Sequence, residues 1–328
     1  MQPFVYVRAA TVDEALAAGR DPDTRYFAGG TNLLDLMKGY VERPTRLVDI
    51  NRLPLAEIAE LPEGGVRVGA LVANSDLANH RLIRERYPLL SQALLAGASP
   101  QLRNMATVGG NLLQRTRCGY FTDAAFPQCN KRAPGSGCGA LDGANRMHAI
   151  LGASEQCIAT HPSDMAVALL ALDAVVLVRG PRSDRRIPMA QFHRLPGSMP
   201  ERDNNLLPGE LITEVELPRS RFAEHSHYLK VRDRASYAFA LVSVACALEQ
   251  DAGGVRDARI VLGGVAHKPW RATAAERRLV GTRLEKDAID SAARASVAGA
   301  KPYRDNAFKV ALAERAVARA VRVAGGIA

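Results

Sequence analysis

The sequence has few aromatic residues, few cysteines and no long apolar run. Phe, Trp and Tyr make up 5% of the 328 residues, and only five residues are cysteine. The longest apolar stretch, Met165–Val178, spans 14 residues and contains Asp173, whereas a membrane-spanning helix needs about 20 apolar residues. The first residues, Met-Gln-Pro-Phe, do not have the basic and apolar regions of a secretory signal. We therefore expect neither a membrane protein nor an export signal on this chain.

The charge is unbalanced in the basic direction. Lys and Arg exceed Asp and Glu by 43 − 34 = 9, and the pI is about 9.6. A nucleic-acid-binding protein would concentrate these residues, together with aromatics, on one element. Here they are scattered, so we expect no nucleic-acid partner and favour an anionic ligand or an acidic partner surface.

The pattern of elements predicts an α+β protein of two domains, with the boundary in the polar residues 218–226. Before the boundary, short helices and strands alternate, beginning with the capping box Thr11-Val-Asp-Glu14. Beyond it, three strands precede three helices. These strands are predicted at Tyr228–Val231, Tyr237–Leu248 and Ala258–Val265, and the helices at Ala272–Val280, Lys286–Ala298 and Tyr303–Val323.

Two glycine turns resemble each other. Ala28-Gly-Gly-Thr-Asn32 lies between a predicted strand and a predicted helix, and Thr107-Val-Gly-Gly-Asn111 repeats the pattern. Glycines let the backbone approach an anion closely, and the N–H groups of a following helix favour a phosphate. One such turn is commonly just a turn, but two together indicate a diphosphate held from both sides.

Four cysteines gather in residues 118–157, within a stretch (115–160) that has little periodicity. Their spacing is Cys118-x10-Cys129-x8-Cys138-x18-Cys157. Four thiolates suit a [4Fe–4S] cluster, a zinc ion or two disulfides. Paired zinc knuckles are absent, and disulfides need an oxidising compartment. These two points favour an iron–sulfur cluster, but a zinc ion, two disulfides and the absence of any site stay open. Nearby basic residues that could offset an anionic cluster are Arg115, Arg117, Lys131, Arg132 and Arg146.

Four motifs resemble the FAD-binding subunit of the xanthine dehydrogenase family of molybdenum hydroxylases. They are Ala28-Gly-Gly-Thr-Asn-Leu-Leu34, Thr107-Val-Gly-Gly-Asn-Leu112, Pro162-Ser-Asp164 and Lys230-Val-Arg-Asp-Arg-Ala-Ser-Tyr237. The four-cysteine insert is similar to the subtype found in bacterial periplasmic aldehyde oxidoreductases. The resemblance implies a PCMH-type FAD-binding domain at 1–222, in subdomains near 1–55 and 56–222 with a [4Fe–4S] loop at 115–160. A C-terminal α+β domain of the CO dehydrogenase flavoprotein type is implied at 223–328.

The same resemblance implies the cofactor residues. Asp164 and Lys230 would contact the flavin; taken alone, their alternatives are a carboxylate at a helix start and a surface lysine on a strand. Cys118, Cys129, Cys138 and Cys157 would ligate the [4Fe–4S] cluster, and Cys246 is expected in the core. The full implied FAD set is Phe27, Ala28, Gly29, Gly30, Thr31, Asn32, Leu33, Ala98, Leu102, Ala106, Thr107, Gly110, Asn111, Leu113, Asp164, Ile212 and Lys230.

The implied activity is electron transfer in a heterotrimeric enzyme that oxidises an aldehyde to a carboxylic acid. A large subunit would hold molybdopterin and a small subunit [2Fe–2S] clusters, with electrons leaving through FAD on this chain to an external acceptor. No catalytic residue is expected here. The alternatives are the flavin subunit of a xanthine or N-heterocycle dehydrogenase, a free-standing flavin oxidase and a zinc-stapled non-redox binding protein. The subtype implies a periplasmic complex exported by a partner's signal, with the cytoplasm as the alternative. Residues 192–208 depart from the family pattern, and no contact is predicted there.

Overall fold

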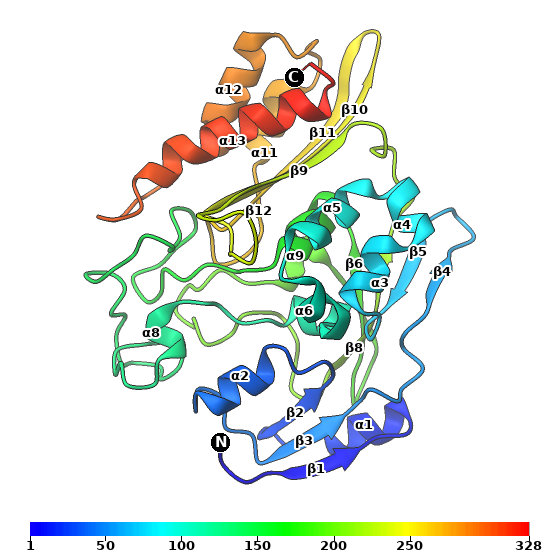
Figure 1. Cartoon of the computed structure of the whole chain (residues 1–328), viewed down its shortest axis with the longest axis vertical. Coiled ribbons are helices and arrows are strands. Elements are labelled where there is room, and N and C mark those ends of the chain that lie inside the picture. The colour runs from blue at the N-terminus through cyan, green and yellow to red at the C-terminus, as the bar shows by residue number, and fades with distance from the viewer. Residues whose placement is uncertain (328) are drawn as a thin grey trace.

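The computed structural model describes residues 1–327, which form three β-sheets stacked along the long axis of the molecule (Figure 1). A three-stranded sheet lies at the N-terminal end, a five-stranded sheet in the middle and a four-stranded sheet at the C-terminal end. None of the helices in these residues is long and apolar enough to cross a membrane. The α+β class expected from the sequence is confirmed.

The first sheet is parallel, in the order β1 (Val5–Arg8), β3 (Arg46–Asp49), β2 (Thr24–Phe27), with helices α1 (Val12–Ala18) and α2 (Leu33–Lys38). The capping box is present. The Thr11 hydroxyl accepts from the Glu14 N–H at 3.1 Å, while the Glu14 carboxylate accepts from the N–H of Ala10 at 2.8 Å, one residue before the cap. This local chemistry explains why the start of α1 could be predicted.

The middle sheet is antiparallel, and its strand order β4-β5-β8-β6-β7 brings distant parts of the chain together. Its strands are β4 (Ile58–Glu60), β5 (Val66–Gly69), β6 (Val175–Arg179), β7 (Arg185–Pro188) and β8 (Leu211–Leu217). Helices α3 (Asn74–Asn79), α4 (Arg81–Arg86), α5 (Pro88–Ala96), α6 (Pro100–Met105), α9 (Asp164–Ala171) and α10 (Met189–Phe192) accompany it. Every residue of α9 is buried, and β6 alternates between buried and half-buried. The longest apolar stretch of the sequence is therefore a core helix followed by a strand.

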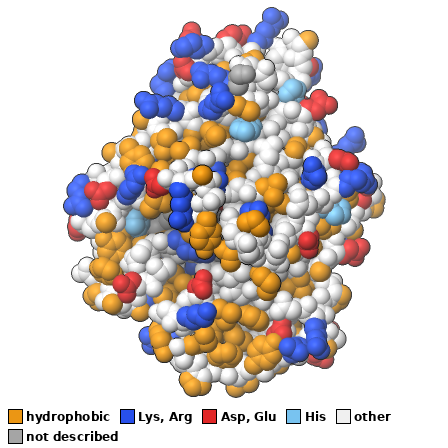
Figure 2. Space-filling view, in the orientation of Figure 1, with side chains coloured by type: hydrophobic (Ala, Val, Ile, Leu, Met, Phe, Trp, Pro, Cys, Tyr) orange, Lys and Arg blue, Asp and Glu red, His pale blue; other side chains and the backbone are white. Residues whose placement is uncertain are grey.

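The C-terminal domain is an antiparallel sheet with three helices on it. Its strands β9 (Ser226–Val231), β10 (Val242–Asp251), β11 (Gly254–Gly263) and β12 (Trp270–Arg271) are followed by α11 (Thr273–Leu279), α12 (Lys286–Ser296) and α13 (Phe308–Ala324). Cys246 is fully buried in the core of this domain, as expected. Lys and Arg side chains gather over its helices (Figure 2), where Arg277, Arg278 and Arg294 line a groove between α11 and α12.

Two predicted boundaries in this domain were wrong. The strand predicted from Tyr237 begins only at Val242, because Tyr237 has a φ of +50°, which an extended strand does not allow. The helix predicted from Tyr303 begins at Phe308, because the Asn306 side chain accepts from the Tyr303 N–H at 2.7 Å and closes a turn first.

The cysteine-rich loop belongs to the first domain in sequence and packs against the C-terminal domain. It is irregular apart from α8 (Gly119–Thr122), and its later part is fixed to the C-terminal domain. Lys309 on α13 is fully buried, and its ammonium donates to the carbonyls of Met147, His148 and Gly264 at 3.1, 3.0 and 2.7 Å. Asn306 donates to the carbonyls of His148 and Ala149, both at 3.2 Å. The loop is thus held in place by side chains more than 140 residues away.

Candidate functional site

The two glycine turns lie against each other. A Cβ on Gly29 would stand 1.7 Å from the carbonyl oxygen of Met105, and Gly30 adopts a φ of +69°. Only glycine permits both the close approach and the left-handed conformation. The second turn begins α7 (Val108–Leu112), where the Thr107 hydroxyl accepts from the Gly110 N–H at 3.3 Å. The two glycine turns together form an open stretch of backbone, here called the backbone cradle, which side chains in place of the glycines would fill.

The asparagine of each turn is oriented by its oxygen. Oδ1 of Asn32 accepts from the N–H of Arg115 at 2.9 Å, and Oδ1 of Asn111 accepts from the Ser163 hydroxyl at 2.6 Å. Neither Nδ2 donates to another described residue, so both amide groups are left as donors beside the cradle. This arrangement fits a phosphate-containing ligand.

Asp164 and Lys230 form a buried pair. Nζ of Lys230 lies 2.8 Å from Oδ2 of Asp164, and the side chains are only 4% and 9% exposed. The Tyr228 hydroxyl donates to Oδ1 of Asp164 at 2.7 Å. Burial, together with the Asp164 charge, raises the pKa of Tyr228 well above its ordinary value. Ser163 caps α9 by accepting from the N–H of Ala166, so α9 begins where the sequence indicated.

The expected FAD residues differ in burial and in where they lie. A Cβ added to Gly97 would lie 3.2 Å from Oδ2 of Asp164, so the next residue, Ala98, lies beside the buried pair. Ala98 has a φ of +51°. Ile212 is different, because its side chain is buried in the core of the middle sheet opposite Val178, which leaves only its backbone for a ligand. The half-buried members are Phe27, Ala28, Gly29, Gly30, Thr31, Asn32, Leu33, Leu102, Ala106 and Asn111, and the exposed members are Ala98, Gly110 and Leu113.

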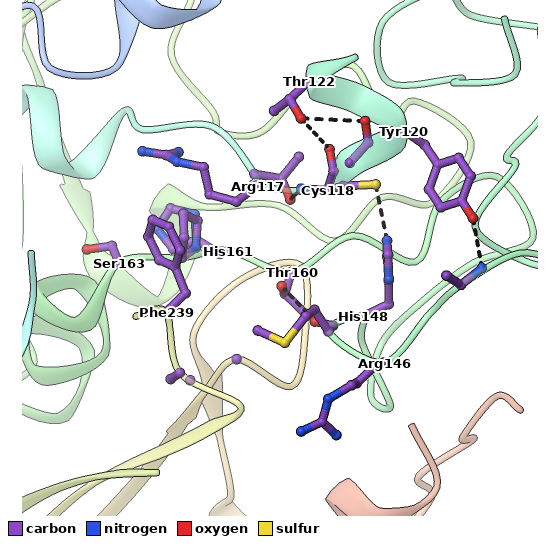
Figure 3. Close-up of a pocket in the computed structure, with 18 of the residues that line it drawn as sticks. Arg117, Cys118, Tyr120, Thr122, Arg146, His148, Thr160, His161, Ser163 and Phe239 are labelled. Atoms are coloured by element: carbon purple, nitrogen blue, oxygen red, sulfur yellow. Dashed lines mark hydrogen bonds between the residues drawn. The ribbon is translucent and has the colours of Figure 1, made fainter. Parts of the chain in front are cut away.

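A cavity of about 650 Å³ extends from Asp164 to Cys118 (Figure 3). His148 on its wall points its Nε2 toward the Cys118 sulfur, 3.1 Å away. The guanidinium of Arg117 lies over the Phe239 ring, 5.1 Å from the centroid. Of the expected flavin residues only Asp164 lies on this wall. The cavity therefore lies between the Asp164–Lys230 pair and the cysteine-rich loop.

The four clustered cysteines line one small cavity. Cys129 and Cys138 face each other in a short backbone bridge, and all five cysteines within residues 1–327 are free thiols. Burial raises the pKa of Cys118 to about 12 and that of Cys157 to about 11. Such thiols ionise only when a cation binds them.

The donor set fits a cluster ligated by four cysteines, although no three His, Cys, Asp or Glu side chains among the described residues are grouped closely enough for a single metal ion. In a four-iron cluster each thiolate binds a different iron, which spreads the four ligands further than one zinc ion does. The four thiols therefore have the donor chemistry of a cluster, but they are not drawn together as metal ligands among the described residues.

The basic residues around the loop are largely paired already. Arg115 contacts Glu42 at 2.6 Å and Asp203 at 2.8 Å, and the buried ammonium of Lys131 also contacts Asp203. Arg146 contacts Asp233 at 2.6 Å. Three of the five basic residues expected to offset a cluster's charge thus have carboxylate partners, whereas Arg117 and Arg132 form no ion pair with a described residue. Asp203 was not predicted as a functional residue, although it lies in the one segment, 192–208, that departs from the family pattern.

Comparisons with known proteins agree with this architecture. The model of the FAD-binding domain in molybdopterin dehydrogenase matches residues 2–220, and that of the CO dehydrogenase flavoprotein C-terminal domain matches residues 227–324. The chain belongs to the family of FAD-binding subunits of molybdenum hydroxylases, which are oxidoreductases.

Individual relatives include the aldehyde oxidoreductase FAD-binding subunit PaoB of Escherichia coli, 54% identical over 97% of both chains. The glyceraldehyde dehydrogenase medium chain of Sulfolobus acidocaldarius is 29% identical over 87% of this chain and 84% of its own. Among solved structures, carbon monoxide dehydrogenase from Hydrogenophaga pseudoflava superposes with a TM-score of 0.78 at 28% identity, covering 99% of this chain and 98% of its own.

Proposed function

We propose that this chain is the FAD-binding electron-transfer subunit of a heterotrimeric molybdenum aldehyde oxidoreductase. Aldehyde and water would become carboxylic acid, two protons and two electrons at a molybdopterin-binding large subunit. The electrons would reach this chain through the [2Fe–2S] clusters of a small subunit and leave to an external acceptor. The observation that carries the proposal is the 54% identity to PaoB over nearly the whole chain.

The two glycine turns would hold the diphosphate of FAD. Their backbone N–H groups, the Asn32 and Asn111 amides and the start of α7 supply donors without any side chain in the way. Bound FAD supplies the redox chemistry, accepting and releasing electrons. The buried Asp164–Lys230 pair would fix a polar group of the flavin, because both side chains are oriented by hydrogen bonds to the protein.

The four cysteines would ligate a [4Fe–4S] cluster. Their shared cavity supports this proposal over four independent free thiols. The alternative within the family is the flavin subunit of a xanthine or N-heterocycle dehydrogenase. That enzyme would differ in the substrate that its large subunit oxidises. The cluster loop favours the aldehyde oxidoreductase subtype.

The test is to co-express the chain with its proposed large and small subunits and to assay the purified complex. Aldehyde-dependent reduction of a dye that needs all three subunits would support the proposal. A colourless chain that contains one zinc ion, or a chain that oxidises substrate alone, would overturn it in favour of the binding-protein or free-standing-oxidase alternatives. Purine oxidation without aldehyde oxidation would favour the xanthine dehydrogenase alternative.

For localisation we propose the periplasm, with the folded complex exported under a twin-arginine signal on a partner subunit. The subtype resemblance supports this assignment. Cell fractionation with and without the partner's signal tests it, because the chain should leave the periplasmic fraction when that signal is deleted. Retention in the cytoplasm with every signal intact would favour the alternative compartment.

A further inference from the structure

Cys129 and Cys138 lie directly opposite each other across a hairpin in the cysteine-rich loop. The two segments pair in the antiparallel sense at these residues. The main-chain hydrogen bonds that flank the pair run from the Asn130 N–H to the Gly137 carbonyl at 2.7 Å and from the Gly139 N–H to the Gln128 carbonyl at 3.0 Å. Because the neighbours of the cysteines make these bonds, the cysteines themselves are a non-hydrogen-bonded pair, the narrower kind of antiparallel pair.

This pairing has the geometry that a disulfide needs. Residues in such a pair have Cα atoms about 4.5 Å apart and side chains on the same face of the ladder. A disulfide joins residues whose Cα atoms are about 4.4–6.8 Å apart. The sulfurs of Cys129 and Cys138 can therefore be joined by rotation of the two side chains.

The other two clustered cysteines have different contacts. The Cys118 sulfur lies 3.1 Å from Nε2 of His148 (Figure 3). The Cys157 sulfur accepts a hydrogen bond from the N–H of Ala159 at 3.4 Å, and Cys157 pairs through its main chain with Ser154. Within residues 1–327 no other two cysteines lie opposite each other in a main-chain pair.

The two members of the pair differ in access. Cys129 is 6% exposed, whereas Cys138 is half-buried, so a small reagent reaches Cys138 first. The hairpin between them turns through Gly135 and Gly137, which have φ values of +86° and +92°. A Cβ on Gly135 would meet nothing within 4 Å, so the turn is open to solvent. An accessible thiol backed by a buried one is the arrangement of an attacking and a resolving cysteine.

We propose that Cys129 and Cys138 form a disulfide in a chain that carries no cluster, and that a thiol reductant must open it before iron can bind. The oxidant is a low-molecular-weight disulfide of the glutathione type. The Cys138 thiolate attacks one sulfur of this disulfide, its S–S bond breaks, and one glutathione leaves as a thiolate. The Cys129 thiolate then attacks the Cys138 sulfur, and the second glutathione leaves. The two cysteine protons pass to the released thiolates, so two protein thiols are oxidised and one disulfide is reduced.

The disulfide would act as a gate on the proposed cluster site. It withholds two of the four sulfur donors, because a sulfur in a disulfide is not a thiolate and does not bind iron. Conversely, sulfurs that bind iron are not free to pair. The gate rests on the proposed cluster, whereas the disulfide itself does not. Iron uptake by this chain would thus require reducing conditions.

The test uses the purified full chain, treated with a chelator and dithiothreitol and then freed of both in the absence of air. The chain is incubated with oxidised glutathione, remaining thiols are blocked with N-ethylmaleimide, and unreduced peptides are analysed by mass spectrometry. Chymotryptic cleavage after Phe121 separates Cys118 from Cys129, and tryptic cleavage after Lys131 separates Cys129 from Cys138. We expect one linked pair of peptides, which joins Cys129 to Cys138.

Cys118→Ser and Cys157→Ser are the matched controls, because each removes a clustered cysteine from outside the pair, and both should keep the link. Cys129→Ser should lose the link and leave Cys138 as a glutathione adduct. Cys138→Ser should leave the buried Cys129 unmodified. Links to Cys118 or Cys157, or glutathione adducts alone in the wild type, would overturn the inference. The wild-type result decides the question even if a variant does not fold.

The same treatment of the chain with its iron still bound separates this inference from the proposed function. Iron-containing chain should keep Cys129 and Cys138 as thiols, and removal of iron with a chelator should then permit the link. Equal rates of link formation with and without iron would overturn the gate. A wild-type chain that holds no iron but forms the link would overturn the proposed cluster, and the gate with it, while supporting the disulfide.

Discussion

The ammonium of Lys230 on β9 lies 2.8 Å from the carboxylate of Asp164 at the start of α9, with both side chains almost fully buried. The pair joins the C-terminal domain to the FAD-binding domain at the edge of the large cavity. Lys230 also donates to the Ala96 carbonyl at 3.1 Å, so the ion pair fixes three segments of the chain relative to one another.

Removal of one partner of this pair should destabilise the protein strongly. Lys230→Met leaves the Asp164 charge buried, and we expect a loss of about 3–5 kcal/mol in the free energy of unfolding, measured by urea denaturation. Lys286→Met is the matched control, because its pair with Asp290 is exposed and its loss should change the free energy of unfolding very little. Equal losses in the two variants would show that burial of the pair does not matter.

Gly29→Ala should abolish FAD binding. The added Cβ would overlap the Met105 carbonyl at 1.7 Å, so the two glycine turns must separate. Gly39→Ala is the control, since its Cβ would meet its nearest neighbour at 3.5 Å. We expect the purified Gly29 variant to lack flavin absorption and the Gly39 variant to keep it. Full flavin content in the Gly29 variant would refute the diphosphate cradle.

Buried neutral histidines should make stability depend on pH. The pKa values of His148, His193 and His267 are lowered by burial to about 4, whereas the unfolded chain binds these protons near pH 6.5. The unfolded state therefore binds more protons between these values, and stability should fall as the pH drops from about 6.5 to 4. Urea denaturation at several pH values measures this slope. His193→Gln should have a shallower slope, and an unchanged slope would contradict the assignment.

Asp203 should stabilise the fold at neutral pH. Burial alone would raise its pKa, but the charges of Lys131 and Arg115 outweigh burial and hold the pKa well below its usual range. This stabilisation is present above the ordinary pKa of 3.8 and is lost as the pH falls below that value. The difference in unfolding free energy between wild type and Asp203→Asn should thus be constant above about pH 5 and shrink below pH 4. A difference that grows in acid would have the wrong sign.

The contact between α13 and the cysteine-rich loop should protect that loop. Lys309→Met removes one donor from the carbonyls of Met147 and His148, which keep Thr160 and Asn306 as donors. It also removes the donor to the Gly264 carbonyl, and an unsatisfied buried acceptor costs about 1–3 kcal/mol. We expect limited proteolysis to cut near residues 143–149 faster than in wild type. Lys301→Met, which changes an exposed lysine, should leave the cleavage rate unchanged. Equal cleavage in all three proteins would contradict the role of Lys309.

Features set by neighbouring residues could be predicted from the sequence. The side chains of Thr11 and Ser163 each accept from the N–H group three residues ahead, so these caps depend on local contacts alone. The strand start near Tyr237 was misplaced because the apolar residues before Val242 continue the strand pattern, while the backbone turns at Tyr237.

Contacts between distant segments could not be predicted in this way. Nothing local to Lys230 or Asp164 indicates that they pair, and nothing local to His161 or His193 indicates that their rings are in contact. Asp203 lies in a polar loop, and its role follows only from the side chains that surround it.

Cofactor content tests the central claim most directly. The complex should be purified with its partner subunits and analysed for flavin, and the chain then separated and analysed for iron and sulfide. We predict one FAD per chain and about four iron and four sulfide in the separated chain, with iron and sulfide lost in Cys129→Ser and retained in Cys246→Ala. A chain without flavin, or with iron unaffected by the Cys129 substitution, would contradict the account.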